Sequence, residues 1–284
     1  MILTLTIAVT LYIFCLVSIR SVVTPDGEYY LAMGRGAHVP RPYALRSIAQ
    51  LLPNIMSWRV LHAVSYLWLA IMSHTFAEMH GADGTAVAIG VLCLPTLRQS
   101  VGWPVLLDVP MLAYIATAAV YGSESTLVAC IMIGLAPIIH ERAAIWSALY
   151  LCTSVHPVFI VASLLVSGMM YAQLYFMQQS HHDEHSIDWL RNPIKAALAK
   201  HIPTLNDWRV WVLPWGASII GLAWDNVLVY AAMIVGYAGC IAAQDRARIY
   251  APAALLLTTG AVLVAGDFAI AIPIVNYFIH IREV

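Results

Sequence analysis

Charged residues are scarce in this chain. They make up 10% of its 284 residues, whereas hydrophobic residues make up 61%. A soluble domain carries roughly 25% charged and 45–50% apolar residues. The composition therefore excludes a soluble enzyme, a disordered chain and a nucleic-acid-binding protein. It predicts a multi-pass integral membrane protein with almost no mass outside the bilayer.

Several sequence motifs are also missing. The chain has no G-x-x-x-x-G-K-[ST] loop, which excludes an ATP-driven pump contained in this chain, and it has no G-x-S-x-G or H-E-x-x-H motif. Its five cysteines lie in apolar runs and form no C-x-x-C pair, so we expect small buried hydrophobic residues and not a metal cage. The cysteines are Cys15, Cys93, Cys130, Cys152 and Cys240.

Long apolar runs dominate what is present. A membrane-spanning helix needs about 20 apolar residues, and the runs predict an all-α, polytopic transmembrane helix bundle of eight to ten spans, forming one domain over residues 1–284. The candidate spans are 2–23, 59–77, 86–97, 101–121, 127–139, 143–177, 210–223, 227–243, 250–264 and 268–281. The run 143–177 is too long for one ordinary span, so we expect either one kinked helix or a short re-entrant piece followed by a span.

Two long polar stretches interrupt these runs. The first, residues 24–58, begins with an irregular acidic turn at Pro25 and Gly27, and the apolar spacing in residues 41–52 predicts an amphipathic helix on the membrane surface. The second, residues 178–208, predicts another amphipathic helix around residues 180–208. The histidines within 181–185 have no matching second cluster, so we expect a solvated loop and not a metal site.

Ionisable side chains are costly in a membrane, so those near spans are candidates for function. Asp26 and Glu28 follow the first span and predict either a carboxylate base near phosphate-binding arginines or a solvated loop. Asp108 has two interpretations. It is a buried carboxylate that needs a polar partner or a water-filled cavity, or it is the N-cap of a helix at the membrane interface. His140 and Glu141 either line a site or form an interfacial turn.

The order of these motifs resembles the GT-C glycosyltransferases, which are polytopic enzymes that use polyprenyl-phosphate-linked sugars. The resemblance covers about residues 24 to 255. It rests on Asp26-Gly27-Glu28-Tyr29-Tyr30, on the stretch 32–46 with Pro42 and Arg46, on Asp108-Val109-Pro110 with the turn at Glu141, and on Asp245-Arg246-Ala247-Arg248 before Pro252. The chain departs from the family in being short. In addition, the positive-inside rule puts the first loop in the cytoplasm, opposite to the family's orientation.

The resemblance implies an inverting transfer of a sugar from polyprenyl phosphate to an acceptor hydroxyl. A mannose-type sugar is the leading candidate. Asp26 is then the catalytic base and Glu28 the second candidate. The implied donor-phosphate ligands are Arg35, Arg41, Arg46, Arg246 and Arg248, and the implied substrate-binding residues are Tyr29, Tyr30, Asp108, His140 and Glu141. No metal, nucleotide or other cofactor is implied. The implied partners are the lipid bilayer, the lipid-linked sugar donor and an acceptor glycan, lipid or protein.

Two other classes stay open. A transporter, flippase or channel would use a buried polar relay composed of Asp108, His140, Glu141 and His156. We expect His156, as a lone histidine on an apolar face, to be a packing residue otherwise. A non-catalytic membrane scaffold would use its polar groups for structure alone and would tolerate Asp26→Asn.

Overall fold

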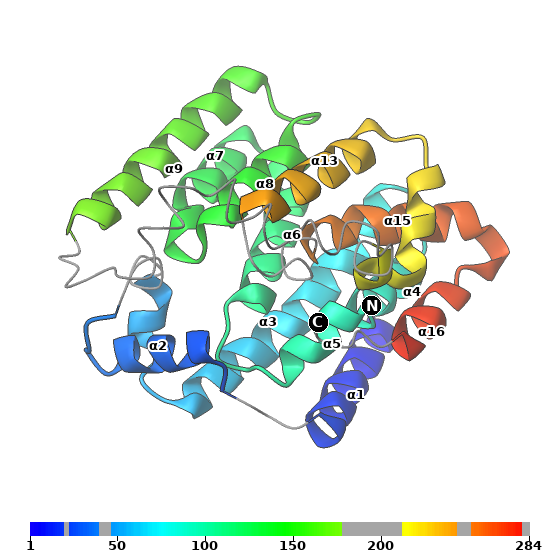
Figure 1. Ribbon diagram of the computed structural model, residues 1–284. Coiled ribbons are helices and arrows are strands. Elements are labelled where there is room, and N and C mark those ends of the chain that lie inside the picture. The colour runs from blue at the N-terminus through cyan, green and yellow to red at the C-terminus, as the bar shows by residue number, and fades with distance from the viewer. Residues whose placement is uncertain (20–22, 40–46, 178–211, 243–250, 280–284) are drawn as a thin grey trace. The chain divides into compact units, whose positions relative to one another are not determined.

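The computed structural model describes residues 1–19, 23–39, 47–177, 212–242 and 251–279 (Figure 1). Within these ranges all regular structure is helical, which confirms the all-α prediction. The α-helices are α1 (Ile2–Ser18), α2 (Pro25–Gly34), α3 (Ile55–Met79), α4 (Gly84–Leu92), α5 (Pro95–Val101), α6 (Asp108–Glu124), α7 (Thr126–Leu135), α8 (Glu141–Leu151), α9 (Pro157–Met177), α13 (Val227–Ala242), α15 (Ala254–Ala265) and α16 (Ala271–Phe278). The 3-10 helices are η2 (Ser47–Leu51), η3 (Ala136–Ile138), η5 (Leu213–Ala223), η6 (Ala251–Ala253) and η7 (Gly266–Phe268).

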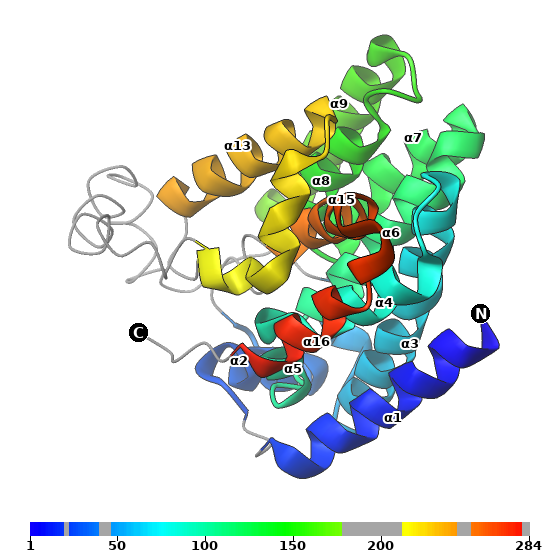
Figure 2. The same ribbon diagram turned by 90° about the vertical axis from the view of Figure 1, so that its right-hand side faces the viewer.

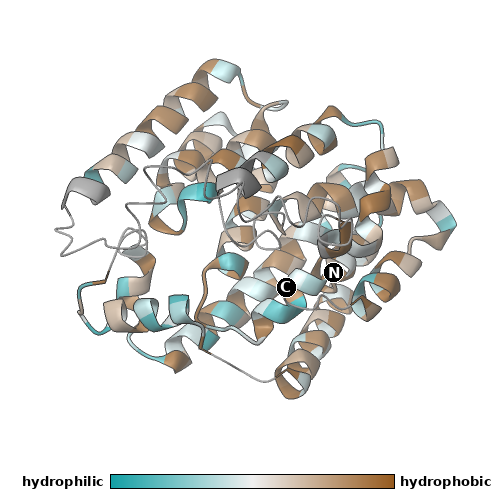
Figure 3. Cartoon of the chain, in the orientation of Figure 1, coloured by the Kyte–Doolittle hydropathy of each residue, from teal (hydrophilic) through white to brown (hydrophobic). Residues whose placement is uncertain are grey.

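Two helical segments are long and apolar enough to cross a membrane. They are α3 and the segment Ala251–Phe268, which comprises η6, α15 and η7. The pair α4 and α5 meets the same test as one broken span, with a bend of 62°. Helices such as α1 and α9 are apolar along most of their length (Figure 3), but their apolar described parts are shorter than 18 residues. The described residues thus hold two candidate spans, or three with the bent pair, and the number of eight to ten stays a prediction.

The apolar run 143–177 forms two helices, so a single kinked helix is wrong. α8 ends at Leu151 and α9 begins at Pro157. Proline favours the first position of a helix because it lacks the N–H that would otherwise bond to the preceding turn. His156, just before α9, is exposed, and its Nδ1 accepts a hydrogen bond from the Val158 N–H at 3.4 Å. It is a residue at a helix start and not a packing residue.

The chain divides into two compact units. Unit 1 comprises Met1–Thr10, Ser73–Gln99 and Glu184–Val284, and unit 2 comprises Leu11–Met72 and Ser100–Asp183. Three of the four boundaries fall inside α1, α3 and α5, and the fourth, between residues 183 and 184, lies outside the described residues. Each of these helices therefore contributes one part to each unit.

Unit 2 contains two apolar clusters. The first joins α2 and η2 to the start of α3 and to the segment before α6, through Tyr30, Leu31, Met33, Ala49, Trp58, Val105, Leu106 and Leu107. The second joins α6, α7, α8 and α9, which lie side by side in Figure 1. Gly122 permits the close approach of α6 to α7, because a Cβ there would lie 3.3 Å from the Ala129 backbone.

The predicted surface helix over residues 41–52 differs from the structure in its described part. Residues 47–51 form the 3-10 helix η2, with Ala49 buried in the first apolar cluster and Ile48 and Leu52 packed against it. The apolar face predicted for the membrane surface therefore contacts unit 2 itself. Residues 40–46, and the predicted second amphipathic helix around 180–208, lie outside the described residues.

Unit 1 packs η5 against α15, and it packs α16 against α4 (Figure 2). The first contact is close because a Cβ at Gly221 would lie 2.0 Å from the Leu257 carbonyl oxygen. The buried Asn276 of α16 joins three segments. Its Oδ1 accepts from the Ala217 N–H at 2.7 Å, and its amide donates to the Gly90 carbonyl at 3.0 Å and to the Ser218 hydroxyl at 2.9 Å.

Candidate functional site

The acidic motif begins a helix, so the irregular turn expected at Pro25 and Gly27 is wrong. Thr24 is the N-cap of α2, and its hydroxyl accepts a hydrogen bond from the Gly27 N–H at 3.2 Å. A capping threonine followed by proline and by acidic residues in the first turn is a helix-start pattern. Asp26 and Glu28 occupy that first turn, where a helix favours negative charge.

The residues of this motif differ in their exposure. Glu28 and Tyr29 are exposed and Asp26 is half-buried, so a substrate can reach all three. Tyr30 has no exposed surface, and its ring lies 5.6 Å from that of Trp58 in the first apolar cluster. We therefore assign Tyr30 to the core of unit 2 and withdraw it from the substrate-binding residues.

One of the five predicted phosphate-binding arginines is described. Arg35 is the exposed C-cap of α2. At 1.5 Å per residue its backbone lies about 14 Å along the helix from that of Asp26. Arg35 thus stands at the opposite end of α2 from the two carboxylates. The other four, Arg41, Arg46, Arg246 and Arg248, lie outside the described residues.

Asp108 comes close to this motif through the packing of α2. A Cβ at Gly27 would lie 3.1 Å from the Val105 carbonyl oxygen, and residues 105–107 share an apolar cluster with α2. Asp108 is the next residue and the first of α6, and it is 3% exposed. The N-cap of α6 is Leu107, so the interpretation of Asp108 as an N-cap is wrong. Unit 2 brings the start of α2 and the start of α6 together.

His140 and Glu141 stand at the start of α8 together with Arg142. The Nδ1 of His140 lies 3.3 Å from the Glu141 carboxylate, and its Nε2 lies 3.1 Å from the Arg142 guanidinium. As the N-cap of α8, His140 accepts a hydrogen bond at Nδ1 from the Arg142 N–H, at 3.2 Å. His140 is 1% exposed, so a substrate would meet Glu141 and Arg142 first.

A further polar site in unit 2 was missed by the sequence analysis. His62 of α3 is 1% exposed, and its Nδ1 lies 3.4 Å from the Tyr12 hydroxyl of α1, with the two rings stacked at 5.9 Å. His62, Ser65 and Tyr66 recur at helical spacing inside an apolar run, and this polar face was the signal available in the sequence.

Two predictions about side-chain chemistry can be compared with the structure. Cys15 and Cys93 are buried and Cys130 is half-buried, but Cys152 is exposed between α8 and α9, so its predicted burial is wrong. Among the residues that the structure describes, no group of three or more His, Cys, Asp and Glu side chains is placed to hold a metal ion. Residues 181–185 lie outside that part of the chain.

Comparison of the chain with protein-family models, with curated proteins and with solved structures finds no match. Its function is therefore argued from its own residues.

Proposed function

We propose that the chain is a multi-pass integral membrane glycosyltransferase of the GT-C type. It transfers a sugar from a polyprenyl-phosphate donor to an acceptor hydroxyl, and a mannose-type sugar is the leading candidate. The observation that carries the proposal is the pair Asp26 and Glu28, two accessible carboxylates in the first turn of α2, a helix that begins seven residues after the last residue of the apolar helix α1. The lipid part of a polyprenyl-phosphate donor stays in the membrane, so the groups that react with its phosphate-linked sugar have to lie near the end of an apolar segment.

The proposed chemistry is an inverting displacement. The acceptor oxygen bonds to the anomeric carbon, the bond from that carbon to the phosphate oxygen breaks, and polyprenyl phosphate leaves. Asp26 takes the proton of the acceptor hydroxyl. Its half-buried position supports this role over Glu28, because a base with fewer water neighbours needs less desolvation.

The surrounding residues have proposed roles of their own. The exposed Glu28 and Tyr29 bind the acceptor or the sugar, since both can be reached from solvent. Asp108 and the group of Glu141 and Arg142 lie in the same unit and bind substrate hydroxyls or phosphate. Arg35, Arg41 and Arg46 stay the proposed phosphate ligands, because charge develops on the phosphate as the donor bond breaks.

The test is sugar transfer by the full chain in lipid vesicles. Radiolabelled polyprenyl-phosphate mannose is the donor and host extract the acceptor, with wild type, Asp26→Asn and the control Asp267→Asn compared. Asp267 is an exposed carboxylate in η7 of unit 1, remote in sequence from the motif. We expect Asp26→Asn to lose transfer by about 10²–10⁴-fold, the usual contribution of a general base, and Asp267→Asn to retain it.

Absence of both transfer and donor hydrolysis by folded wild type, across several lipid-phosphate sugars, would contradict the proposal. The transporter class would then be favoured, because Asp108 and His62 are buried polar residues of unit 2. That class predicts substrate-linked ion flux, whereas a scaffold predicts neither flux nor transfer. His156 is exposed and would not belong to a buried relay.

A further inference from the structure

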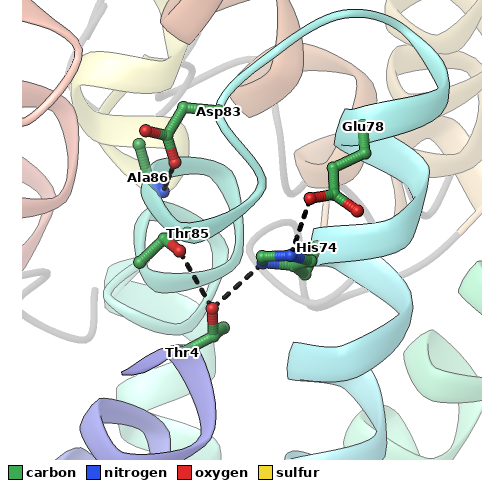
Figure 4. Close-up of polar contacts among 6 residues, drawn as sticks. All are labelled: Thr4, His74, Glu78, Asp83, Thr85 and Ala86. Carbon is green, nitrogen blue, oxygen red and sulfur yellow. Dashed lines mark hydrogen bonds and ion pairs between the residues drawn. The ribbon is translucent and has the colours of Figure 1, made fainter. Parts of the chain in front are cut away.

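Unit 1 contains a row of hydrogen-bonded polar side chains that the proposed transferase chemistry does not use. Figure 4 shows it running from Glu78 and His74 on α3 to Thr4 on α1 and Thr85 on α4. His74 Nε2 lies 3.0 Å from the Glu78 carboxylate, His74 Nδ1 lies 3.0 Å from the Thr4 hydroxyl, and the two threonine hydroxyls are 3.0 Å apart. Segments distant in the sequence therefore meet in one hydrogen-bonded row.

The direction of every bond in this row follows from the acceptor at its end. A carboxylate only accepts, so His74 carries a proton on Nε2, and in the neutral imidazole Nδ1 is then an acceptor. Thr4 must then donate its one proton to Nδ1. Because that proton is used, Thr85 must donate to the Thr4 oxygen. The row reads Thr85 to Thr4 to His74 to Glu78, each donating to the next.

The row has accessible ends and a buried middle. Thr4 is fully buried and His74 is 5% exposed, whereas the Glu78 side chain is 62% exposed and Thr85 is half-buried. Of the two threonines, Thr85 is therefore the one whose surface an outside molecule can reach.

Two features of α4 hold Thr85 in place. Asp83 caps the helix, and its carboxylate accepts from the Ala86 N–H at 2.9 Å. A Cβ at Gly84 would lie 2.8 Å from the His74 ring, so this glycine lets the helix backbone approach the imidazole. The start of α4 is thus fitted to the histidine on α3.

A hydroxyl, a histidine within 2.6–3.2 Å of it and a carboxylate orienting the histidine form the arrangement that activates oxygen nucleophiles. We propose that the Thr85 hydroxyl is a nucleophile for a lipophilic ester, activated through Thr4 by His74 and Glu78. The ester is lipophilic because the helices around the row are apolar, with no charged side chain in α1 or α4. This site lies in unit 1 and is independent of the transferase proposed for Asp26.

The proposed step balances in atoms and charge. The Thr85 oxygen bonds to the acyl carbon as its own proton moves to the Thr4 oxygen and the Thr4 proton moves to His74 Nδ1. The bond from the acyl carbon to the leaving alcohol breaks. The leaving oxygen regains a proton from His74 by way of Thr4, and Glu78 stabilises the imidazolium that forms in between.

The test uses an alkyl fluorophosphonate, which reacts with base-activated hydroxyls by the same proton path, with fluoride leaving. The full chain in lipid vesicles is labelled and the modified residue is located by peptide mass spectrometry. We expect the label on Thr85, and we expect it to form at least about 10²-fold more slowly in His74→Asn, the usual range for a lost base. Asparagine retains an oxygen acceptor near the Nδ1 position but cannot take the proton.

Matched variants separate base activation from simple packing. Thr4→Ser retains the relay hydroxyl and should keep the labelling rate, whereas Thr4→Val should lose it. Thr10→Val is the control on the same helix, because the Thr10 hydroxyl bonds only to the Thr6 carbonyl of its own turn. Absence of label in folded wild type, or an unchanged rate in His74→Asn, would overturn the proposal. Asp26→Asn should label as wild type does, so the two proposals fail separately.

Discussion

The start of α2 and the row from Thr85 to Glu78 are both polar, but their members are fixed in different ways. Glu28 and Tyr29 are exposed at the surface of unit 2. Thr4 and His74 are buried in unit 1, where each holds a neighbour on another helix. Buried polar groups that lose a partner cost free energy, whereas exposed ones regain water. If a substitution of an exposed residue of α2 lowers activity, the loss is therefore chemical. A substitution of Thr4 or His74 in unit 1 also changes the stability of the protein.

The largest effect on stability is expected at Gly221. In Gly221→Ala the new Cβ would lie 2.0 Å from a backbone carbonyl of Leu257, which cannot move aside as a side chain can. Overpacking of this kind costs about 1–3 kcal/mol or more. We expect little folded protein, measured as the fraction that stays monodisperse in size-exclusion chromatography after mild heating.

The control for this prediction is Gly168→Ala in α9. Nothing lies within 4 Å of a Cβ at that position. Alanine in a helix interior is favoured over glycine by about 0.5–1 kcal/mol. The control should therefore be neutral or slightly more stable, and equal losses in both variants would mean that the contact between η5 and α15 is not close.

An effect of comparable size is expected at Asn276. Asn276→Ala removes three hydrogen bonds and leaves the Gly90 carbonyl, the Ala217 N–H and the Ser218 hydroxyl without this partner. Buried polar groups that lose a partner cost about 1–3 kcal/mol each, so we expect a loss of about 3 kcal/mol in the free energy of unfolding.

Reversible denaturation of the purified protein measures this change. Asn226→Ala is the matched variant, since the Asn226 side chain accepts a hydrogen bond from the Leu228 N–H at the start of α13, at 2.9 Å. Loss of such a cap costs about 1 kcal/mol. An Asn276→Ala variant no less stable than Asn226→Ala would show that the amide does not join the three segments.

A smaller effect on stability is expected at Thr24, the N-cap of the helix that carries the two carboxylates. Thr24→Ala removes the hydroxyl that accepts from the Gly27 N–H, and an N-cap contributes about 1 kcal/mol. We expect a loss of that size, measured by thermal unfolding, together with reduced sugar transfer because the first turn of α2 would lose its fixed position. Thr24→Ser retains the cap and should restore both, so failure of serine to rescue transfer would argue against this positioning role.

The sequence predicted those parts of the fold that depend on local apolar content. The run 59–77 corresponds to α3, Ile55–Met79, and the run 227–243 corresponds to α13, Val227–Ala242. The run 210–223 contains a 3-10 helix interrupted at Gly216, whose φ is 52°, and apolar content does not distinguish this from an α-helix. Three of the four boundaries between the two units fall inside helices, where no change of composition marks them.

The candidate site was predictable only in part for the same reason. Asp26 and Glu28 stand out because their charges lie beside an apolar run, but the burial of Tyr30 depends on which face of α2 meets Trp58. The polar contacts of His62 and His74 were not predictable, because their partners Tyr12 and Thr4 lie 50 and 70 residues away in the sequence. A lone histidine in an apolar run gives no indication of a distant partner.

The smallest effect on stability is expected at Glu28. Its side chain is exposed, so Glu28→Gln loses only its favourable interaction with the start of α2, which is about 0.3–1 kcal/mol at such positions. For a protein of this size that corresponds to a fall of at most about 2–4 °C in the melting temperature. Differential scanning fluorimetry of the two proteins measures it, with the exposed Glu124 at the end of α6 as the matched Glu→Gln site. A much larger fall would mean that Glu28 supports the fold, and a loss of transfer at α2 would then no longer distinguish chemistry from stability. A small fall with reduced transfer would place Glu28 among the residues that contact the substrate.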